Sequence, residues 1–211
     1  MPAFPSATAL PRRSIAAALL AAPFAWTGAR AQQPALRRLT PAQTEGPFYP
    51  VELPRDSDAD LLRNGTLQYG KGQAAWVEGS VSDPHGRPVA GAVVEIWQCD
   101  QDGHYHHPGD RGRADPAFQG FGRVQVGADG RYRFRTIRPA AYAGRTPHIH
   151  AKVRLGTREL LTTQLYVAGD PGNARDGLWR RLDGEARAAL TADFLPGADG
   201  LRAQFPLVVA A

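Results

Sequence analysis

The sequence predicts an all-β protein, built as a single antiparallel β-sandwich with a long N-terminal arm and little helix. Short stretches of alternating apolar and polar residues recur after residue 73, separated by turns rich in Gly, Pro and Asp. Good helix formers gather only at 184–190, apart from a possible short helical turn at 61–63. With 43% hydrophobic residues among 211, the chain can bury a core, which excludes a mostly disordered protein. The single cysteine, Cys99, excludes an intrachain disulfide.

Residues 1–31 have the three parts of an export signal. Arg12 and Arg13 precede the apolar run 14–22, and residues 29–31 form an A-x-A cleavage site. The run is too short and too rich in alanine to predict a membrane span. The arginine pair also fits a weak twin-arginine signal. We therefore expect an exported protein, periplasmic or secreted, with no stable membrane insertion after processing.

The distribution of charge argues against a nucleic-acid partner. The whole chain has a formal net charge of +5, but residues 1–31 carry three arginines and no acidic residue, so their removal lowers the charge to +2. The rest of the chain has only two lysines, Lys71 and Lys152, and no basic run interleaved with aromatic residues. The basic character marks the export signal rather than a binding surface for a polyanion.

Residues 32–72 predict an extended N-terminal arm rather than a regular element. This part of the chain is rich in Pro, Gly and polar residues, with Gly46-Pro47-Phe48-Tyr49-Pro50 near its middle. After residue 73 the composition changes to short alternating apolar and polar stretches, so we expect the β-sandwich domain to occupy 73–211.

Six stretches of that domain predict strands, namely 75–81, 92–98, 123–126, 131–137, 148–153 and 160–166. The turn at 128–130 favours a hairpin that pairs 123–126 with 131–137. In the second of these strands Tyr132, Phe134 and Thr136 share one face and the arginines share the other. Trp76 and Trp97 are expected in the core.

The pair His148 and His150 carries the strongest chemical signal. Alternate residues of a strand point the same way, about 7 Å apart, so the two imidazoles can bind one metal ion while Ile149 faces the core. On its own, this pattern indicates two surface histidines about as often as it indicates a metal site. Tyr105 and Tyr142, however, lie in loops beside strand ends. A phenol is a poor ligand for Zn²⁺ or Mg²⁺ because its pKa is near 10, whereas hard Fe³⁺ favours a phenolate. The set therefore indicates ferric iron.

In these motifs the chain resembles the intradiol ring-cleavage dioxygenases, nearest the protocatechuate 3,4-dioxygenase type. The resemblance extends from about Thr40 to Tyr166. It rests on motifs that occur in the same order, at 44–50, 91–98, 102–105, 129–139, 142, 145–150 and 163–166.

The resemblance implies one Fe(III) per chain, bound by two tyrosines and two histidines, with a catechol-like substrate and O₂ as partners. Matched motif by motif, the iron ligands are Tyr105, Tyr142, His148 and His150. The family's active-site arginine falls on Arg145 and its glutamine on Gln164, although Gln164 can equally be a plain strand residue. In such enzymes the tyrosine corresponding to Tyr142 leaves the iron and helps to take a substrate proton. The arginine stabilises negative charge that develops on the ring.

Only two residues separate Tyr142 from Arg145, where the well-studied relatives carry a longer insert. The identity of the catechol, including whether it bears a carboxylate, is therefore left open. Relatives associate through sandwich faces and N-terminal arms, so a homo-oligomer is a further expectation that the sequence leaves open.

Two other classes and one other ligand assignment compete with this interpretation. Residues 77–92 also fit transthyretin-like or carboxypeptidase-regulatory-like binding modules, but such modules lack the tyrosine and histidine set. A cupin would place a glutamate four or five residues after the second histidine, whereas Glu159 follows His150 by nine. We expect His104, His106 and His107 to be solvated loop residues, with replacement of Tyr105 by one of them as a minor alternative.

Overall fold

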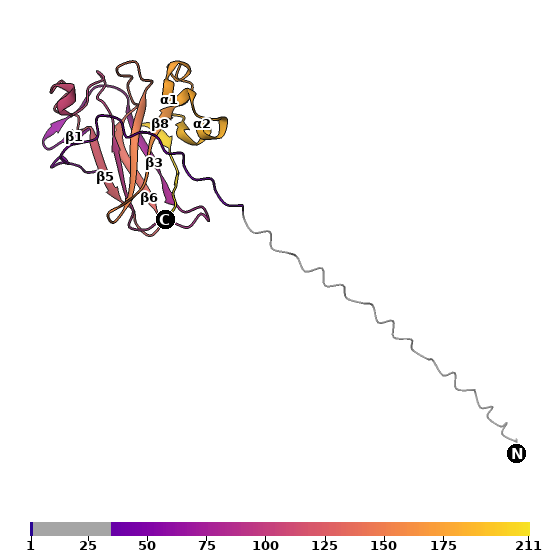
Figure 1. Cartoon of the computed structure of the whole chain (residues 1–211). Helices are drawn as coiled ribbons and strands as arrows, with labels where there is room; N and C mark the ends of the chain where they lie inside the picture. Colours follow the sequence, from indigo (N-terminus) through magenta and orange to yellow (C-terminus); the bar gives the residue numbers. More distant parts are fainter. Residues whose placement is uncertain (2–34) are drawn as a thin grey trace. The chain divides into compact units, whose positions relative to one another are not determined.

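The computed structural model describes Met1 and residues 35–211, so the predicted export signal lies outside the described residues beyond Met1. The described part is mostly β, with little helix (Figure 1). No helix in this described part is long and apolar enough to cross a membrane.

Two five-stranded sheets form the framework (Figure 1). In one, the order is β10-β11-β3-β12, and β6 pairs with the other edge of β3. Its strands are β3 (Ala74–Ser82), β6 (Arg131–Ile137), β10 (Leu195–Gly197), β11 (Gly200–Gln204) and β12 (Leu207–Val208). In the other, the order is β5-β4-β7-β8-β9. Its strands are β4 (Val93–Trp97), β5 (Phe121–Gln125), β7 (His148–Leu155), β8 (Arg158–Val167) and β9 (Thr191–Ala192).

The prediction of purely antiparallel strand pairing is wrong at three places. β11 and β12 both run parallel to β3, and β9 runs parallel to β8. These three strands come from the last part of the chain, which returns to the edges of sheets already formed by the central strands. Sequence periodicity sets which face of a strand is apolar, and it carries no information about strand direction.

The predicted hairpin between 123–126 and 131–137 is also wrong. β5 pairs with β4 and β6 pairs with β3, so the turn between β5 and β6 crosses from one sheet to the other. The ends of this turn bind different strands: Val126 N donates to Ala92 O, whereas Gly130 O accepts from Val81 N. A tight turn therefore joins the two sheets here, with β5 paired to β4 on one side and β6 paired to β3 on the other.

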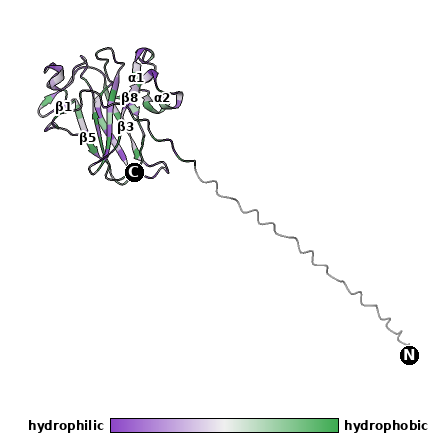
Figure 2. Ribbon diagram, viewed as in Figure 1, coloured by the Kyte–Doolittle hydropathy of each residue, from purple (hydrophilic) through white to green (hydrophobic). Residues whose placement is uncertain are grey.

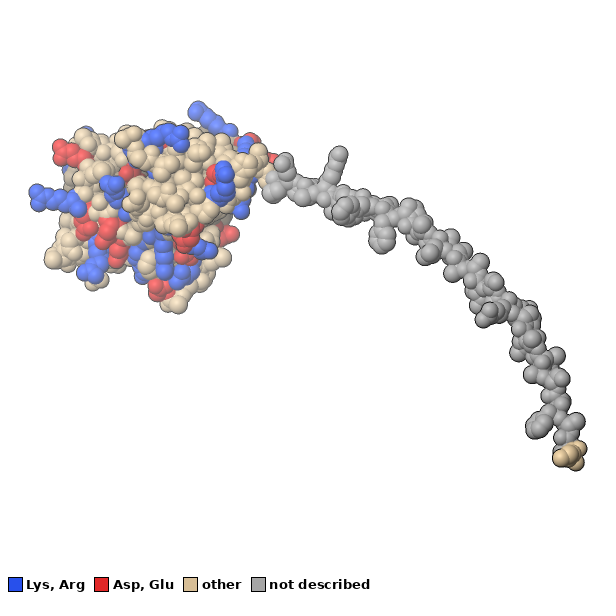
Figure 3. Space-filling view, turned by 90° about the horizontal axis from the view of Figure 1, so that it is seen from below, with Lys and Arg blue, Asp and Glu red and all other residues tan. Residues whose placement is uncertain are grey.

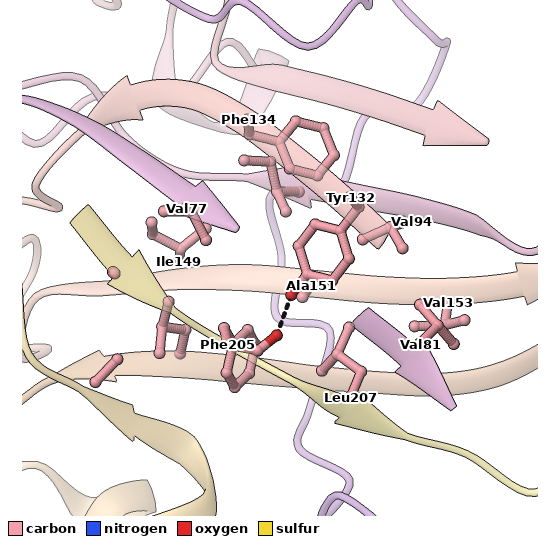
Figure 4. Close-up of a cluster of buried hydrophobic side chains, with 14 of the residues drawn as sticks. Val77, Val81, Val94, Tyr132, Phe134, Ile149, Ala151, Val153, Phe205 and Leu207 are labelled. Carbon is pink, nitrogen blue, oxygen red and sulfur yellow. Dashed lines mark hydrogen bonds between the residues drawn. The ribbon is translucent and has the colours of Figure 1, made fainter. Parts of the chain in front are cut away.

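The inner faces of the two sheets share one hydrophobic cluster (Figure 4). Green, hydrophobic stretches along the strands in Figure 2 alternate with hydrophilic ones. Tyr132 and Phe134 point into the cluster, as their predicted common face requires. The Tyr132 hydroxyl donates to Phe205 O, so its polar end is satisfied within the core (Figure 4). Ile149 of β7 packs against the same cluster and is 1% exposed, as predicted.

Trp76 was expected in the core, and this expectation is wrong. The ring is half-buried on the outer face of β3, between the buried neighbours Ala75 and Val77. The guanidinium of Arg133 lies 3.5 Å from the ring centroid, and the indole N–H donates to Asp199. Period-2 alternation places Trp76 outside, where cation–π contact replaces core packing.

Within residues 35–211, helix is confined to short pieces: η1 (Pro108–Asp110), η2 (Asn173–Arg175), α1 (Gly177–Arg180) and α2 (Gly184–Leu190). The helix predicted at 184–190 is confirmed. The predicted short turn at 61–63 is present, because Leu61 and Leu62 form a turn in which Arg63 N donates to Asp60 O over 3.2 Å, but it does not extend into a helix. A two-strand hairpin of β1 (Arg63–Asn64) and β2 (Leu67–Gln68) follows within the predicted arm. The face seen in Figure 3 mixes Lys and Arg with Asp and Glu.

Candidate metal centre

The candidate centre lies on the outer face of the β5-β4-β7-β8 part of the sheet. Ile149 and Ala151 of β7 face the core, so the alternate residues His148, His150 and Lys152 face outward. All three are nevertheless buried, with 1–3% of each exposed. A buried outer face carrying imidazoles and an ammonium group indicates a built site rather than a solvated surface.

The cross-strand register surrounds His150 with two site residues. His150 lies opposite Trp97 of β4 and opposite Gln164 of β8, and His148 lies opposite Tyr166. The Trp97 ring stacks on the His150 ring, with centroids 4.8 Å apart and planes inclined by 9°. This stacking fixes the plane of one imidazole.

The two imidazoles point their Nε2 atoms at each other, 3.2 Å apart. His148 Nδ1 lies 2.6 Å from Thr146 O, so Nδ1 carries the proton and Nε2 presents a lone pair. Burial lowers the pKa of His148 to about 4. Burial, and next the neighbouring His148, lower the pKa of His150 well below its ordinary value. Both rings are therefore neutral at pH 7, which is the form that binds metal ions.

The two tyrosines lie next to these histidines. The rings of Tyr105 and Tyr142 meet edge to face at 5.0 Å, Tyr142 lies 5.4 Å from His148, and Tyr105 lies 6.3 Å from His150, all between centroids. Burial raises the pKa of both phenols. Among the described residues, nothing hydrogen-bonds the buried Tyr105 hydroxyl or His150 Nδ1. The structure thus brings the four predicted ligands together.

This donor set fits a ferric ion. A buried phenol without a partner is costly unless a cation binds its oxygen. The described residues hold no group of three or more His, Cys, Asp or Glu that could bind a metal. Phenolate and imidazole together suit Fe³⁺ better than Zn²⁺ or Mg²⁺.

Arg145 reaches the site through a tight turn after Tyr142. Ala143 and Gly144 have φ of 42° and 77°, and Arg145 N donates to Tyr142 O over 2.7 Å. Arg145 Nη2 donates to Gln164 Oε1 over 2.8 Å, so these two predicted site residues are in direct contact. Gln164 is fully buried and its amide also donates to Thr44 O.

Asp176 is a site residue that sequence reasoning missed. Its Oδ2 accepts from Arg145 Nε over 2.6 Å and from Thr146 N over 3.0 Å, and its Oδ1 caps α1 through Leu178 N. Burial opposes ionisation, but hydrogen bonds led by that from Arg145 keep the pKa of Asp176 below its ordinary value. An Asp before a short helix is the only local signal, and it predicts a cap rather than a partner for Arg145.

A second missed residue, Asp110, holds the loop that carries Tyr105. Its Oδ2 accepts from Tyr105 N over 2.6 Å, and Arg113 binds the other oxygen. The nearby histidines are engaged elsewhere: His106 Nε2 lies 3.0 Å from Asp115 O, and His107 caps η1. His104 Nδ1 lies 3.5 Å from the Asp110 carboxylate. Nothing in these contacts favours a loop histidine over Tyr105 as a ligand.

Residues 44–50, here called the strap, cover the buried outer face of the sheet. Phe48 stacks on Tyr105 with centroids 4.5 Å apart. Gly46 has φ of 73°, and a Cβ added to it would lie 3.3 Å from His150 Cε1. The Phe48 ring also meets the Tyr142 ring edge to face, with centroids 5.7 Å apart. The strap therefore contacts three of the four candidate ligands, and glycine at 46 allows the close approach to His150.

A family model described as Dioxygenase matches residues 44–199. The protocatechuate 3,4-dioxygenase beta chain of Burkholderia cepacia is 38% identical over an alignment of 162 residues, gaps included, that covers 70% of this chain and 68% of that protein. Hydroxyquinol 1,2-dioxygenase of Corynebacterium glutamicum is 31% identical, over 73% of this chain and 57% of that protein. This chain thus spans little more than half of that second relative.

Two solved structures extend the similarity to the fold. The dioxygenase domain of a dioxygenase carbohydrate-binding protein fusion from Streptomyces sp. SirexAA-E aligns with a TM-score of 0.65 and 33% identity, over 81% of this chain and 97% of that one. Catechol 1,2-dioxygenase from Acinetobacter sp. ADP1 aligns with a TM-score of 0.64 and 27% identity, over 81% of this chain and 62% of that one.

Proposed function

This chain belongs to the intradiol ring-cleavage dioxygenase family, and from that premise we propose that it binds one Fe(III) and uses O₂ to cleave a catechol-type ring to a muconate-type diacid. The observation that carries the proposal is the convergence of two phenols on two neutral imidazoles whose Nε2 atoms are 3.2 Å apart. The ligands in this proposal are Tyr105, Tyr142, His148 and His150.

Ferric iron bound by these residues would supply a Lewis acid and a template for substrate. The protein's own part is to hold the donors in place. Thr146 O fixes the tautomer of His148, and Asp110 fixes the backbone at Tyr105. These two contacts hold the His148 ring and the Tyr105 backbone in position for metal binding.

Tyr142 and Arg145 have different roles. The Tyr142 ring is only half-buried, and its oxygen is proposed to take a proton from an entering catechol. Burial raises its pKa, while the Arg145 charge lowers it, so the guanidinium favours the phenolate form. Asp176 and Gln164 hold Arg145 in a fixed orientation, ready to stabilise negative charge on the ring.

Metal analysis combined with a visible spectrum of the purified chain tests the proposal. We expect one iron per chain and a red-brown charge-transfer band from tyrosinate to iron. An oxygen electrode with catechol, hydroxyquinol and protocatechuate should then identify the substrate class. A colourless protein that takes up no metal, with no oxygen uptake on any of these diphenols, would refute the proposal.

We also propose the route of export, the domain organisation and the assembly from the sequence. Residues 1–31 act as an export signal, and the 32–72 arm with the 73–211 β-sandwich forms one working unit. Replacing Arg12 and Arg13 by lysine should block secretion if the twin-arginine route is used, and normal secretion would indicate the general route. Light scattering of the mature chain would measure whether a homo-oligomer forms.

A further inference from the structure

The buried ammonium group of Lys152 is not used by the proposed reaction. Lys152 lies two residues after His150 on the same face of β7 and is 3% exposed. Its Nζ contacts Glu45 Oε2 of the strap and lies 3.4 Å from Glu159 Oε2 of β8. A buried cation is stable only when anions or an aromatic face replace its water. The strap supplies one of these anions, the Glu45 carboxylate, to Lys152.

The aromatic face is also supplied by the strap. The Lys152 Nζ lies 3.9 Å from the centroid of the Tyr49 ring, within the range of a cation–π contact. The Tyr49 hydroxyl donates to the buried Glu95 over 2.9 Å, and the ring meets Trp97 edge to face at 5.0 Å. Burial, and next the hydrogen bond to Glu95, raise the pKa of Tyr49, so it remains a donor. Two strap residues are therefore bound to β7 and β4.

Between and beside these two attachments, the strap meets the candidate ligands. Gly46 follows Glu45 directly and approaches His150 closely, while Phe48 precedes Tyr49 and stacks on Tyr105. Loosening at Lys152 would therefore weaken the contacts of Gly46 with His150 and of Phe48 with the two tyrosines. Thr44 O and the Tyr49 hydroxyl would keep their own hydrogen bonds, with Gln164 and Glu95 respectively.

We propose that Lys152 is a positioning residue: its ion pair with Glu45 and its contact with the Tyr49 ring clamp the strap over the metal centre. The existence of the clamp is inferred only from the contacts of residues 44–50 with the sheet. Its effect on a bound metal rests, in addition, on the proposed function.

Glu45 and Glu159 provide a matched pair of variants. Both carboxylates contact Lys152 and both are about half exposed, but Glu45 is on the strap and Glu159 is on β8. Glu45→Gln should accelerate backbone hydrogen exchange across 44–50 by about tenfold or more, the effect of losing one charged hydrogen bond. Glu159→Gln should leave exchange of the strap within about twofold of wild type. If hydrogen exchange of the strap accelerated equally in both variants, or did not accelerate in either, the proposed clamp would be wrong.

The visible band of the iron-loaded protein tests the second link. Glu45→Gln should shift or weaken the tyrosinate band, because Phe48 no longer holds Tyr105, whereas Glu159→Gln should keep the wild-type band. An unchanged band in Glu45→Gln, with faster strap exchange, would show that the clamp does not reach the metal centre. Lack of colour in the wild type would refute the proposed function, and the exchange measurement would still decide the clamp.

Discussion

Replacing Asp176 by asparagine tests how Arg145 is held. The asparagine keeps an oxygen to cap α1, but an amide NH₂ at the position of Oδ2 would face two donors, Arg145 Nε and Thr146 N. Bonds to a charged group contribute about 1.5–3 kcal/mol each. The Asp176 side chain is fully buried, while 21% of the Arg145 side chain is exposed and can gain water. We therefore expect the lower part of the summed range, a loss of about 3 kcal/mol in the free energy of unfolding.

Asp183→Asn is the matched control. Asp183 also caps a helix, α2, through Ala186 N, and it pairs with Arg38 on the exposed surface. Asparagine caps helices as well as aspartate does, and an exposed ion pair contributes at most about 1 kcal/mol. Urea unfolding of the metal-free variants at pH 7, followed by tryptophan fluorescence, would compare them. A difference of less than about 0.5 kcal/mol between the two variants would refute the reasoning.

The pH dependence adds a second check. Hydrogen bonds, led by that from Arg145, keep the pKa of Asp176 below its ordinary value despite burial, which acts in the opposite direction. The carboxylate's contribution is therefore complete above the ordinary aspartate pKa of about 3.9, and it is lost as pH falls through the lower folded value. The destabilisation by Asp176→Asn should thus be full at pH 6–7 and should shrink in acid.

Three further outcomes are expected. Tyr105→Phe should remove or shift the charge-transfer band of the iron-loaded protein, and Tyr132→Phe, which alters a core tyrosine, should leave that band unchanged. Gly46→Ala should weaken iron binding measured by chelator competition, because the new Cβ meets His150; Gly65→Ala, with φ of 58° and open space around it, should carry only the backbone cost of about 1 kcal/mol. In the metal-free protein the two site histidines have lowered pKa values, so stability should fall from pH 6.5 towards 4 by up to about 1.4 kcal/mol per unit for each. His148→Gln should reduce that slope in urea midpoints measured at several pH values.

Features that depend on neighbouring residues were predictable from the sequence. The alternation in β6 correctly placed Tyr132 and Phe134 inside, and the spacing of His148 and His150 correctly placed Ile149 in the core between two outward imidazoles. Both follow from the period of two that any strand imposes on its side chains. The same rule, applied strictly, would also have placed Trp76 outside.

Strand partners and the supports of the site depended on the tertiary structure. The turn before β6 looked like a hairpin, but it joins two sheets, because a strand's partner is set by how whole faces pack. Arg145 meets Asp176 from 31 positions away, and Lys152 meets Glu45 from 107 positions away. Arg145 precedes β7 and Asp176 precedes α1, while Lys152 is on β7 and Glu45 is on the strap. Only the folded chain brings the members of each pair together.

The sequence by itself thus determined the residue types of the centre, the common face of its two histidines and the mostly β fold, since each is encoded in short-range pattern and motif order. Only the tertiary structure decided that two phenols meet two neutral imidazoles in a dry site, with Arg145 held by Asp176 and the strap by Lys152. Burial produces this difference. It changes the pKa of each group and makes every unpaired charge costly, and burial is a property of the packed chain rather than of any local segment.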